Sequence, residues 1–535
     1  MTKKIPLGRQ DAQFLLGDSP ETPMHVGGYN VYRLPEGASD DFVRRLVERL
    51  REQPIVSPPW HYRLTKQSAL ASKLSPAWEV VENENIDYHL SHHALPRPGG
   101  ERELGELLSR MHSQPLDMTR PLWEWHVIEG LADRRFVIYQ KIHHSLFDGS
   151  TGMKAFSIMN SETADAPVRA PWAVSEPESR PESARKGWAD RVNAYQKRIR
   201  SASALYQSIP GLALATGRTL RAAIDSSSGL VAPYSAPKCI VNSQVTRRRR
   251  IVTHALDFAR VKAVSKAAEC TLNDVMLALC GAALRRYLDE LGELPKKSLT
   301  GGIPVGLKHQ EGAKSGNSVS LVFTTLGTDV RDPLERLMTI RNSTRAAKDH
   351  LMRMSETSRN AYSVMMLLPA IAGGALGSGR VMCNVPVSNV PGPRTRLYLA
   401  GATLEAAYPT SVLIGNVALG VTCVSYDQGL FVGIVACPDV LPHAQKLGPY
   451  IGDAFAELEA AVGSRLAVEP ATTEPAPRRH AARSRVRRPA GAKRASSVKR
   501  SKAAAKRSPR ARPGAGKSTR GLGSRPKRRA RRRTS

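Results

Sequence analysis

Two adjacent histidines, followed by an aspartate and a glycine, are the residues in this chain whose types and spacing best fit a chemical reaction. They form the pattern His143-His144-x-x-x-Asp148-Gly149. A histidine with the ordinary pKa of about 6.5 can accept a proton at neutral pH, and a positioned base is worth roughly 10² to 10⁴ in rate. The pattern therefore predicts a general base that takes a proton from an alcohol or amine as it attacks an activated carbonyl.

Each member of this pattern also has an alternative explanation. The two histidines could cap the end of a strand without taking part in a reaction. Asp148 could orient a histidine or accept a hydrogen bond from an arginine, and Gly149 permits a tight turn. His144 and Asp148 could share a helical face and bind a metal, but no third ligand is near in the sequence, so we expect none.

The elements around this motif indicate an α/β fold. Residues 136–142 are apolar, β-branched and aromatic, which is typical of a buried strand that ends at the histidine pair. Helical patterns occur at 42–50 and 104–111. Further along the chain a long helix is expected near 271–291, a strand at 319–326, and a β-rich end at 412–435. Two α/β halves with mixed sheets predict a cleft between them, where substrate sites are common.

The expected domain organisation has four parts. An N-terminal half, 1–161, carries the histidine motif, and a C-terminal half spans 247–465. Between them, 162–246 contains a Pro-rich linker and a basic amphipathic helix with Trp188, Val192, Tyr195 and Ile199 on one face. This helix could lie on an anionic membrane or pack on the protein body. Residues 466–535 form a tail rich in Lys and Arg.

The charge of the chain is concentrated in that tail. The 535 residues have a formal net charge of +32, but 24 of the 79 Lys and Arg side chains lie in 475–535, where no Asp or Glu occurs. The first 474 residues carry +8, so the charge does not make the body a nucleic-acid binder. With few hydrophobic residues the tail is expected to be disordered, and to bind nucleic acid or anionic lipid or to add solubility.

Targeting and redox features predict a cytoplasmic protein at the periphery of a membrane or lipid inclusion. The longest apolar stretch is about 13 residues and is interrupted by Pro369, against the ~20 needed to span a bilayer. The N-terminus has no continuous apolar run of the kind found in signal peptides. The six cysteines are scattered without a C-x-x-C pair, as expected for free thiols.

The chain resembles a known enzyme family. His143 to Gly149 matches the HHxxxDG signature of the CoA-dependent acyltransferase superfamily, which includes chloramphenicol acetyltransferase-like enzymes and peptide synthetase condensation domains. Five further motifs are similar to bacterial bifunctional wax ester synthase/diacylglycerol acyltransferases. They are Asp18-Ser-Pro-Glu-Thr-Pro-Met-His-Val-Gly-Gly28, Pro115-Leu-Asp-x-x-Arg-Pro-Leu-Trp123, Thr271-Leu-Asn-Asp274, Gly316-Asn317 and Ser388-Asn-Val-Pro-Gly-Pro393.

The resemblance covers about residues 6–465 and implies a reaction. A fatty acyl group would pass from acyl-CoA to diacylglycerol or a long-chain alcohol, without an acyl-enzyme and without another cofactor. His144 would be the proton acceptor, with His143 and Asp148 in support. Transfer to a polyketide or peptide acceptor, or an inactive coat protein of nucleic acid or lipid inclusions, remain the alternatives.

The supporting motifs have structural as well as catalytic explanations. Thr271 and Asp274 form a capping-box pattern, which accounts for both without catalysis. Asn273 is then free to stabilise a tetrahedral oxyanion, worth roughly 10² to 10³ in rate. Asn389, Pro391 and Gly392 predict a sharp turn, for which an architectural role is favoured. One loop of the C-terminal half departs from the family pattern. Relatives often have a Ser-Arg ending after the Pro-Val of this loop, whereas this chain reads Pro304-Val-Gly-Leu-Lys-His309, with Lys308 keeping a positive charge there.

Overall fold

The computed structural model describes residues 4–7, 9–65, 76–147, 149–174, 229–306, 319–354 and 381–468. All of these residues fall within the unit Met1–Pro470. Residues outside the described ranges include Asp148, the predicted amphipathic helix, Lys308, Gly316-Asn317 and residues 469–535 of the basic tail. The first three residues assigned to the tail, 466–468, are the end of a helix.

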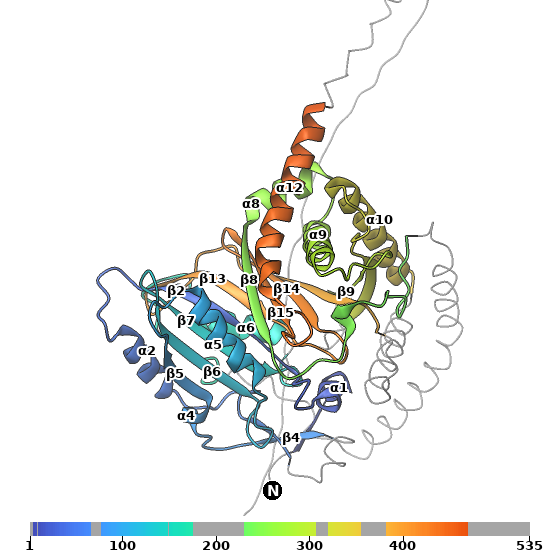
Figure 1. Cartoon of the computed structure of the whole chain (residues 1–535). Helices are drawn as coiled ribbons and strands as arrows, with labels where there is room; N and C mark the ends of the chain where they lie inside the picture. The colour runs from blue at the N-terminus through green and yellow to red at the C-terminus, as the bar shows by residue number, and fades with distance from the viewer. Residues whose placement is uncertain are drawn as a thin grey trace, which may run out of the picture. The chain divides into compact units, whose positions relative to one another are not determined.

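The first large sheet has six strands, in the order β12-β13-β2-β7-β6-β5 (Figure 1). Its strands are β2 (His25–Arg33), β5 (Leu90–Ala94), β6 (Trp123–Leu131), β7 (Arg135–His143), β12 (Tyr398–Leu399) and β13 (Ala402–Thr410). Neighbouring strands are antiparallel except β5 and β6, which are parallel. Because β12 and β13 come from late in the chain, the C-terminal half completes the sheet that carries the histidine motif.

The helices of the N-terminal half are α1 (Arg9–Gly17), α2 (Phe42–Arg51), α4 (Ile86–His89), α5 (Glu101–Ser113) and α6 (Gly149–Met159). A small sheet is formed by β1 (Lys4–Pro6), β4 (Ala77–Val80) and β3 (Tyr62–Leu64), in that order. Glycines let the backbones of the large sheet approach closely. A Cβ on Gly27 of β2 would lie 2.1 Å from the carbonyl oxygen of Gln140 on β7, so no larger residue fits there.

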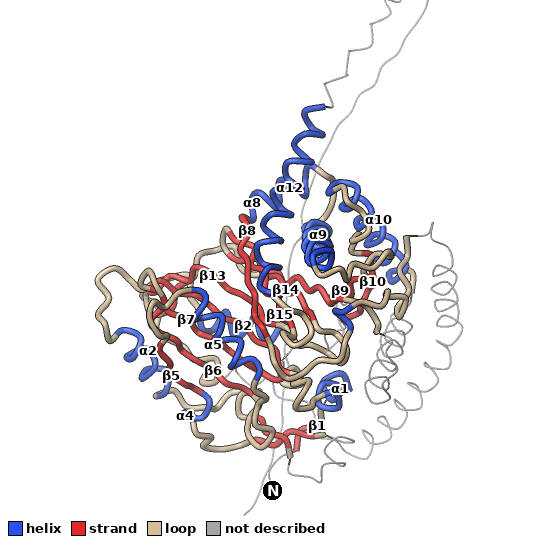
Figure 2. The backbone as a smooth tube through the Cα atoms, viewed as in Figure 1, coloured by secondary structure: helices blue, strands red, loops and turns tan. Residues whose placement is uncertain are grey.

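The second large sheet also has six strands, in the order β10-β9-β11-β14-β15-β8. Its strands are β8 (Arg250–Asp257), β9 (Thr300–Gly306), β10 (Val319–Thr325), β11 (Val385–Pro391), β14 (Leu419–Tyr426) and β15 (Gly429–Ala436). The helices of this half are α8 (Phe258–Ala267), α9 (Leu272–Glu290), α10 (Pro333–Met352) and α12 (Leu447–Val468), with 3-10 turns η3 (Ile240–Asn242) and η4 (Ala444–Lys446). Figure 2 shows α9, α10 and α12 grouped beside this sheet.

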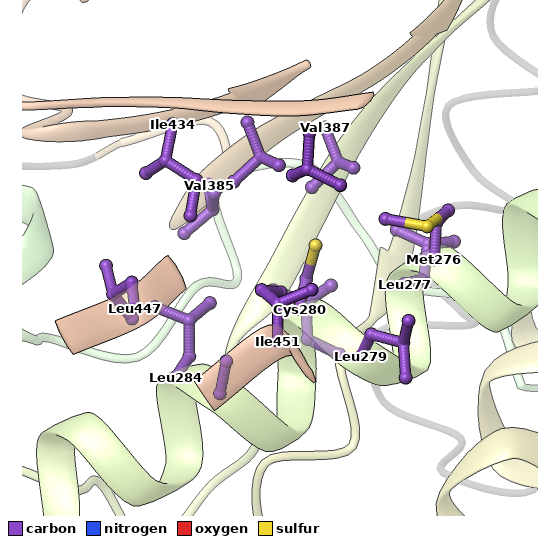
Figure 3. Packing of buried hydrophobic residues seen from close by; sticks show 14 of the residues in the cluster. Met276, Leu277, Leu279, Cys280, Leu284, Val385, Val387, Ile434, Leu447 and Ile451 are labelled. Carbon is purple, nitrogen blue, oxygen red and sulfur yellow. The ribbon is translucent and has the colours of Figure 1, made fainter. Parts of the chain in front are cut away.

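The core of the second half lies between α9, α12 and the sheet (Figure 3). Side chains of α9 such as Met276 and Cys280 point toward Val385 and Val387 of β11, and all four are at most 2% exposed. Apolar side chains on nearly all sides of α9 are buried, which explains why such a long helix carries so few charges. The burial of this apolar surface is the main stabilising term for the half.

The mixed α/β fold expected from the sequence is confirmed. The helices expected at 42–50, 104–111 and 271–291 are α2, α5 and α9, and the strand expected at 136–142 is β7. The strand expected at 319–326 is β10, and the β-rich end contains β14 and β15. The boundaries assigned to the four parts of the chain remain a prediction.

The turn predicted at Pro391-Gly392 is wrong. Strand β11 continues through Pro391, which is in register with Ser425 of the parallel strand β14. Pro391 is the last residue of the strand, where its missing N–H is tolerated. Gly392 is needed because a Cβ there would lie 2.3 Å from the carbonyl oxygen of Ser425. The glycine therefore serves a close backbone approach and not a turn.

No single helix in the described ranges is long and apolar enough to cross a membrane. The consecutive helices α8 and α9 pass that test of length and composition together, with a bend of 101° between them.

Candidate active site

His143 is the last residue of β7, and its imidazole is buried at 1% exposure. The backbone N–H of Ser145 donates to His143 Nδ1 at 3.1 Å, and the Ser145 hydroxyl lies 2.6 Å from the same atom. Because Nδ1 accepts a backbone hydrogen bond, the ring proton of neutral His143 belongs on Nε2. Asp18 Oδ1 lies 3.5 Å from that nitrogen. His143 is thus fixed through Nδ1, faces the Asp18 carboxylate with Nε2, and is enclosed by protein.

The residues between α1 and β2 connect Asp18 to the second histidine. Asp18 Oδ1 accepts a hydrogen bond from the Met24 backbone N–H at 2.8 Å. The Met24 carbonyl in turn accepts the backbone N–H of His144 at 2.9 Å. One carboxylate oxygen therefore fixes the segment that holds the His144 backbone and also faces His143.

His144 follows the strand and is partly exposed, unlike His143. Its ring stacks on Phe14 of α1, with centroids 3.9 Å apart and planes within 5° of parallel. The backbone hydrogen bond to Met24 and the stack on Phe14 restrict the orientation of the imidazole. A partly exposed imidazole in a restricted orientation has the geometry that a general base can use.

Two more histidines near the motif, His25 and His112, are buried. His25 of β2 is in register with His143, and its Nε2 donates to the carbonyl oxygen of His112 at 2.9 Å. Burial lowers the pKa of His112 to about 3, with a smaller contribution from nearby positive charges. Burial, together with His112 and Lys141, also holds the pKa of His25 well below its usual value. These rings therefore stay neutral near pH 7 and pack as polar core residues.

A buried ion pair supports the same strands. Lys141 of β7 is 1% exposed, and its Nζ lies 2.7 Å from Glu124 Oε2 on β6. The Lys141 ammonium also donates to the carbonyl oxygens of Met111 and Gln114 at 3.4 and 3.2 Å. Burial alone would raise the pKa of Glu124, but His126 and Lys141 outweigh it, and the pKa is lowered.

The other predicted site residues come from other elements. Asn273 is in the first turn of α9 and Asn389 is in β11. Among the described residues, no hydrogen bond joins either side chain to the tandem histidines. Gly149 begins α6. Asp148 lies outside the described residues, so its partner and the catalytic roles of the predicted residues remain predictions.

Asp274 forms the cap that the sequence predicts. Thr271 Oγ1 accepts the backbone N–H of Asp274 at 3.2 Å, and Asp274 Oδ2 accepts the backbone N–H of Thr271 at 2.9 Å. Both halves of the capping box are present at the start of α9. Asp274 is therefore explained by helix initiation.

In the described part of the chain, no three His, Cys, Asp or Glu side chains are grouped as a metal site.

The second histidine pair, His92-His93, is on β5, and His93 Nε2 lies 3.1 Å from His126 Nδ1. Burial lowers the pKa of His93 to about 4, followed by the influence of His126 and His92. The contact with His126 indicates a structural role for His93.

Sequence reasoning missed the parts played by Phe14, Asp18 and Met24. Asp18 and Met24 stand within the Asp18-to-Gly28 motif, which was a signal that this segment matters, although not of what it contacts. Phe14 has no local signal, because it approaches His144 only through the packing of α1.

The chain is similar to known proteins over most of its length. Residues 7–276 match the wax ester synthase/diacylglycerol acyltransferase catalytic domain, and 315–459 match the WS/DGAT C-terminal domain. A putative diacylglycerol O-acyltransferase of Mycobacterium tuberculosis is 37% identical over 487 residues, which cover 86% of this chain and 98% of that protein. A putative diacylglycerol O-acyltransferase of Mycobacterium bovis is 37% identical over 458 residues, 84% of this chain and 98% of that protein.

Solved structures give the same result. The wax ester synthase/diacylglycerol acyltransferase from Marinobacter aquaeolei VT8 has a TM-score of 0.68 and 33% identity, covering 86% of this chain and 100% of that one. The first condensation domain of the calcium-dependent antibiotic synthetase shares the fold, with a TM-score of 0.52, 15% identity, and coverage of 86% and 97%. The chain belongs to the wax ester synthase/diacylglycerol acyltransferase family.

Proposed function

We propose that this protein is an O-acyltransferase that moves a long-chain acyl group from acyl-CoA to diacylglycerol, to a long-chain alcohol, or to both. The products are triacylglycerol or wax ester, together with free CoA. The observation that carries the proposal is the placement of His144, which is partly exposed at the end of β7 and stacked on Phe14, beside the buried His143. Family membership supplies the reaction class.

In the proposed mechanism His144 removes the proton of the acceptor hydroxyl. The oxygen attacks the thioester carbonyl carbon, a C–O bond forms, and the carbonyl oxygen becomes an oxyanion. The C–S bond then breaks, the carbonyl re-forms, and the CoA thiolate takes the proton from His144. No bond to the protein forms, so both substrates must be bound together, and their shared orientation lowers the barrier by several kcal/mol.

The other predicted residues have supporting roles in this mechanism. His143 holds the end of β7 through Ser145 and Asp18. The side-chain amide of Asn273 is proposed as the oxyanion donor, and Asp148 as the residue that orients the loop after the histidines. Among the described residues Asn273 makes no side-chain hydrogen bond that would compete with that role.

The direct test follows CoA thiol release from palmitoyl-CoA with diacylglycerol or hexadecanol as acceptor, with the ester product identified by chromatography. We expect His144→Ala to lose at least about 10²-fold in kcat. His92→Ala, in the other histidine pair, is the matched control and should retain turnover. Equal ester formation by the His144→Ala variant and the parent would refute the proposed base.

Two further experiments test the alternative functions. A carrier-bound or peptide acceptor that is acylated faster than diacylglycerol and hexadecanol would favour acyl transfer to a polyketide or peptide. Removal of residues 475–535 should leave turnover intact, because none of the proposed catalytic residues lies there. It should change only where the protein is held in the cell, at an anionic lipid surface or on nucleic acid.

A further inference from the structure

A basic groove lies between α5 of the N-terminal half and the residues that lead into β8 of the C-terminal half. Helix α5 and strand β8 run side by side in Figure 1. Its volume is about 630 Å³, within the range of about 300–1,000 Å³ typical of small-molecule sites. One wall is α5 with Gln114 and Pro115, and the other is residues 247–250 with Pro438. The tandem histidines are not part of its lining.

The groove is built into the contact between the two halves. The Ser109 hydroxyl on α5 accepts the backbone N–H of Ile251 at 3.0 Å. The Ser113 hydroxyl, one turn further along α5, accepts the backbone N–H of Arg249 at 2.8 Å. These bonds fix the two walls relative to each other, so the shape of the groove is set before any ligand binds.

Five arginines line this groove, against a single acidic residue. They are Arg110, Arg247, Arg248, Arg249 and Arg250, and the acidic residue is Glu106. Glu106 already pairs with Arg102 at 3.2 Å, and Arg248 pairs with Asp439. Among the described residues no carboxylate pairs with Arg110, Arg247 or Arg250. Three guanidinium groups at the groove are therefore available for an anionic ligand.

Arg249 links the groove to the active-site segment. It is 4% exposed, and its guanidinium donates to the carbonyl oxygens of Thr246, Arg248 and Glu21, the last at 3.0 Å. Burial lowers the pKa of Arg249 to about 10, so it keeps its charge at neutral pH. A buried cation that only carbonyl groups satisfy adds positive potential beneath the groove.

The groove is within reach of His144. Glu21 is three residues before Met24, whose carbonyl accepts the His144 N–H. Three residues span at most about 10 Å, so the path from the Arg249 guanidinium through Glu21 and Met24 to the His144 backbone nitrogen measures at most about 16 Å. An extended pantetheine arm has a length of the same order by ordinary bond lengths. A nucleotide held in the groove could therefore present its thioester near His144.

We propose that this groove binds the phosphates of the CoA nucleotide, with Arg110, Arg247 and Arg250 as ligands. The inference rests on the proposed function, because it assigns a binding site to the acyl donor. The 3′-phosphate and the diphosphate of CoA match several guanidinium groups in a confined space, where charge-assisted hydrogen bonds are strongest. A recessed groove fits such a ligand better than it fits the flat surface of an anionic membrane.

The test compares two variants of the full-length chain. Arg110→Gln, Arg247→Gln and Arg250→Gln together remove three charges from the groove. The matched control combines Arg44→Gln, Arg45→Gln and Arg49→Gln, which remove three charges from exposed positions on α2. Each protein is assayed with palmitoyl-CoA and with S-palmitoyl-pantetheine, which carries the same arm without the nucleotide. Titration calorimetry with CoA measures binding independently of turnover.

We expect the groove variant to raise the KM for palmitoyl-CoA by about tenfold or more and to weaken CoA binding to the same extent. Its kcat, and its kinetics with S-palmitoyl-pantetheine, should match those of the control, which shows that it is folded. An unchanged KM for palmitoyl-CoA would overturn the proposal, as would an equal loss with both donors. Weaker binding to phosphatidylglycerol vesicles with unchanged CoA binding would also overturn it.

The calorimetric arm separates this inference from the proposed function. If the parent forms no ester with any donor, the proposed function fails, yet CoA binding still tests the groove. CoA binding that is lost in the groove variant and kept in the control would then support the groove as a CoA site. Equal CoA affinity in both variants would overturn it.

Discussion

The ring of Phe14 on α1 lies parallel to the ring of His144, with 3.9 Å between centroids and 5° between planes. The two residues are far apart in the sequence, and only the packing of α1 beside the end of β7 brings them together. Stacking covers one face of the imidazole and not its edge, where the two ring nitrogens lie. It also restricts rotation about the bonds that orient the base.

Phe14→Leu should lower kcat by up to about tenfold with little change in KM. Aromatic pairs contribute about 0.5 to 1.5 kcal/mol beyond their buried area, and that energy is lost from the orientation of the base. Phe14→Tyr should restore turnover, because it keeps the ring. The measurement is a full kinetic profile of each variant from pH 5 to 9.

Leu16→Ala serves as the control for that experiment, since Leu16 is on the same helix but is 43% exposed. A Phe14→Leu variant as active as the Leu16→Ala variant at every pH would show that the stack does not orient His144.

Asp18 is expected to be a positioning residue for both histidines. Asp18→Ala removes the acceptor of the Met24 N–H and the oxygen beside His143 Nε2, so kcat should fall by up to about 10². Asp18→Asn keeps an oxygen in place but not the charge, and should lose less. Glu21→Gln, in the same segment, is the control. If Asp18→Asn and Asp18→Ala lose activity equally, the charge of Asp18 matters more than its hydrogen bond to Met24.

The local parts of the site were predictable because they depend on neighbours in the sequence. The apolar run that ends at His143 and the capping box at Thr271 each have a short-range pattern with one physical explanation. Both are present in the structure. The resemblance to the family supplied the reaction class, which no periodicity contains.

Contacts between distant segments were not predictable in the same way. Strand β13 comes from the C-terminal half but pairs with β2 in the first sheet, where Tyr408 lies opposite Tyr29. Neither strand has a sequence pattern that identifies the other as its partner. The groove arginines also come from two separate segments. At Gly392 the sequence pointed to a turn, because Pro-Gly is common in turns. The close approach to Ser425 that requires the glycine is visible only once β11 and β14 are paired.

Breaking the buried pair of Lys141 and Glu124 should strongly destabilise the protein. Lys141→Met leaves the carboxylate of Glu124, whose side chain is 16% exposed, without its main counter-charge. Loss of one partner of a buried pair costs about 3 to 5 kcal/mol in the free energy of unfolding. Replacing both residues, as Lys141→Met with Glu124→Leu, should cost much less. Urea unfolding of the three proteins measures the difference, and a single variant as stable as the parent would contradict this role.

His112 should make the protein less stable as the pH falls below about 6.5. Its pKa is about 3 in the folded protein, because burial disfavours the charged ring, against about 6.5 in the unfolded chain. Between these values the unfolded state binds a proton that the folded state does not, so acid favours unfolding. The free energy of unfolding should fall by about 1.4 kcal/mol per pH unit from this residue.

The groups that face His112 come from several elements. Its Nδ1 lies 2.8 Å from the Tyr139 hydroxyl, its Nε2 lies 3.3 Å from the carbonyl of Ser411, and Arg249 and Lys141 add positive charge nearby. None of these groups is an anion that would favour the protonated ring. His112→Gln removes the titration, so although it destabilises the protein at pH 7.5, its disadvantage should shrink by about 1.4 kcal/mol at pH 5.5. His443→Asn, at an exposed position, is the matched control. Parallel pH profiles for the parent and the His112→Gln variant would show that another group sets the acid sensitivity.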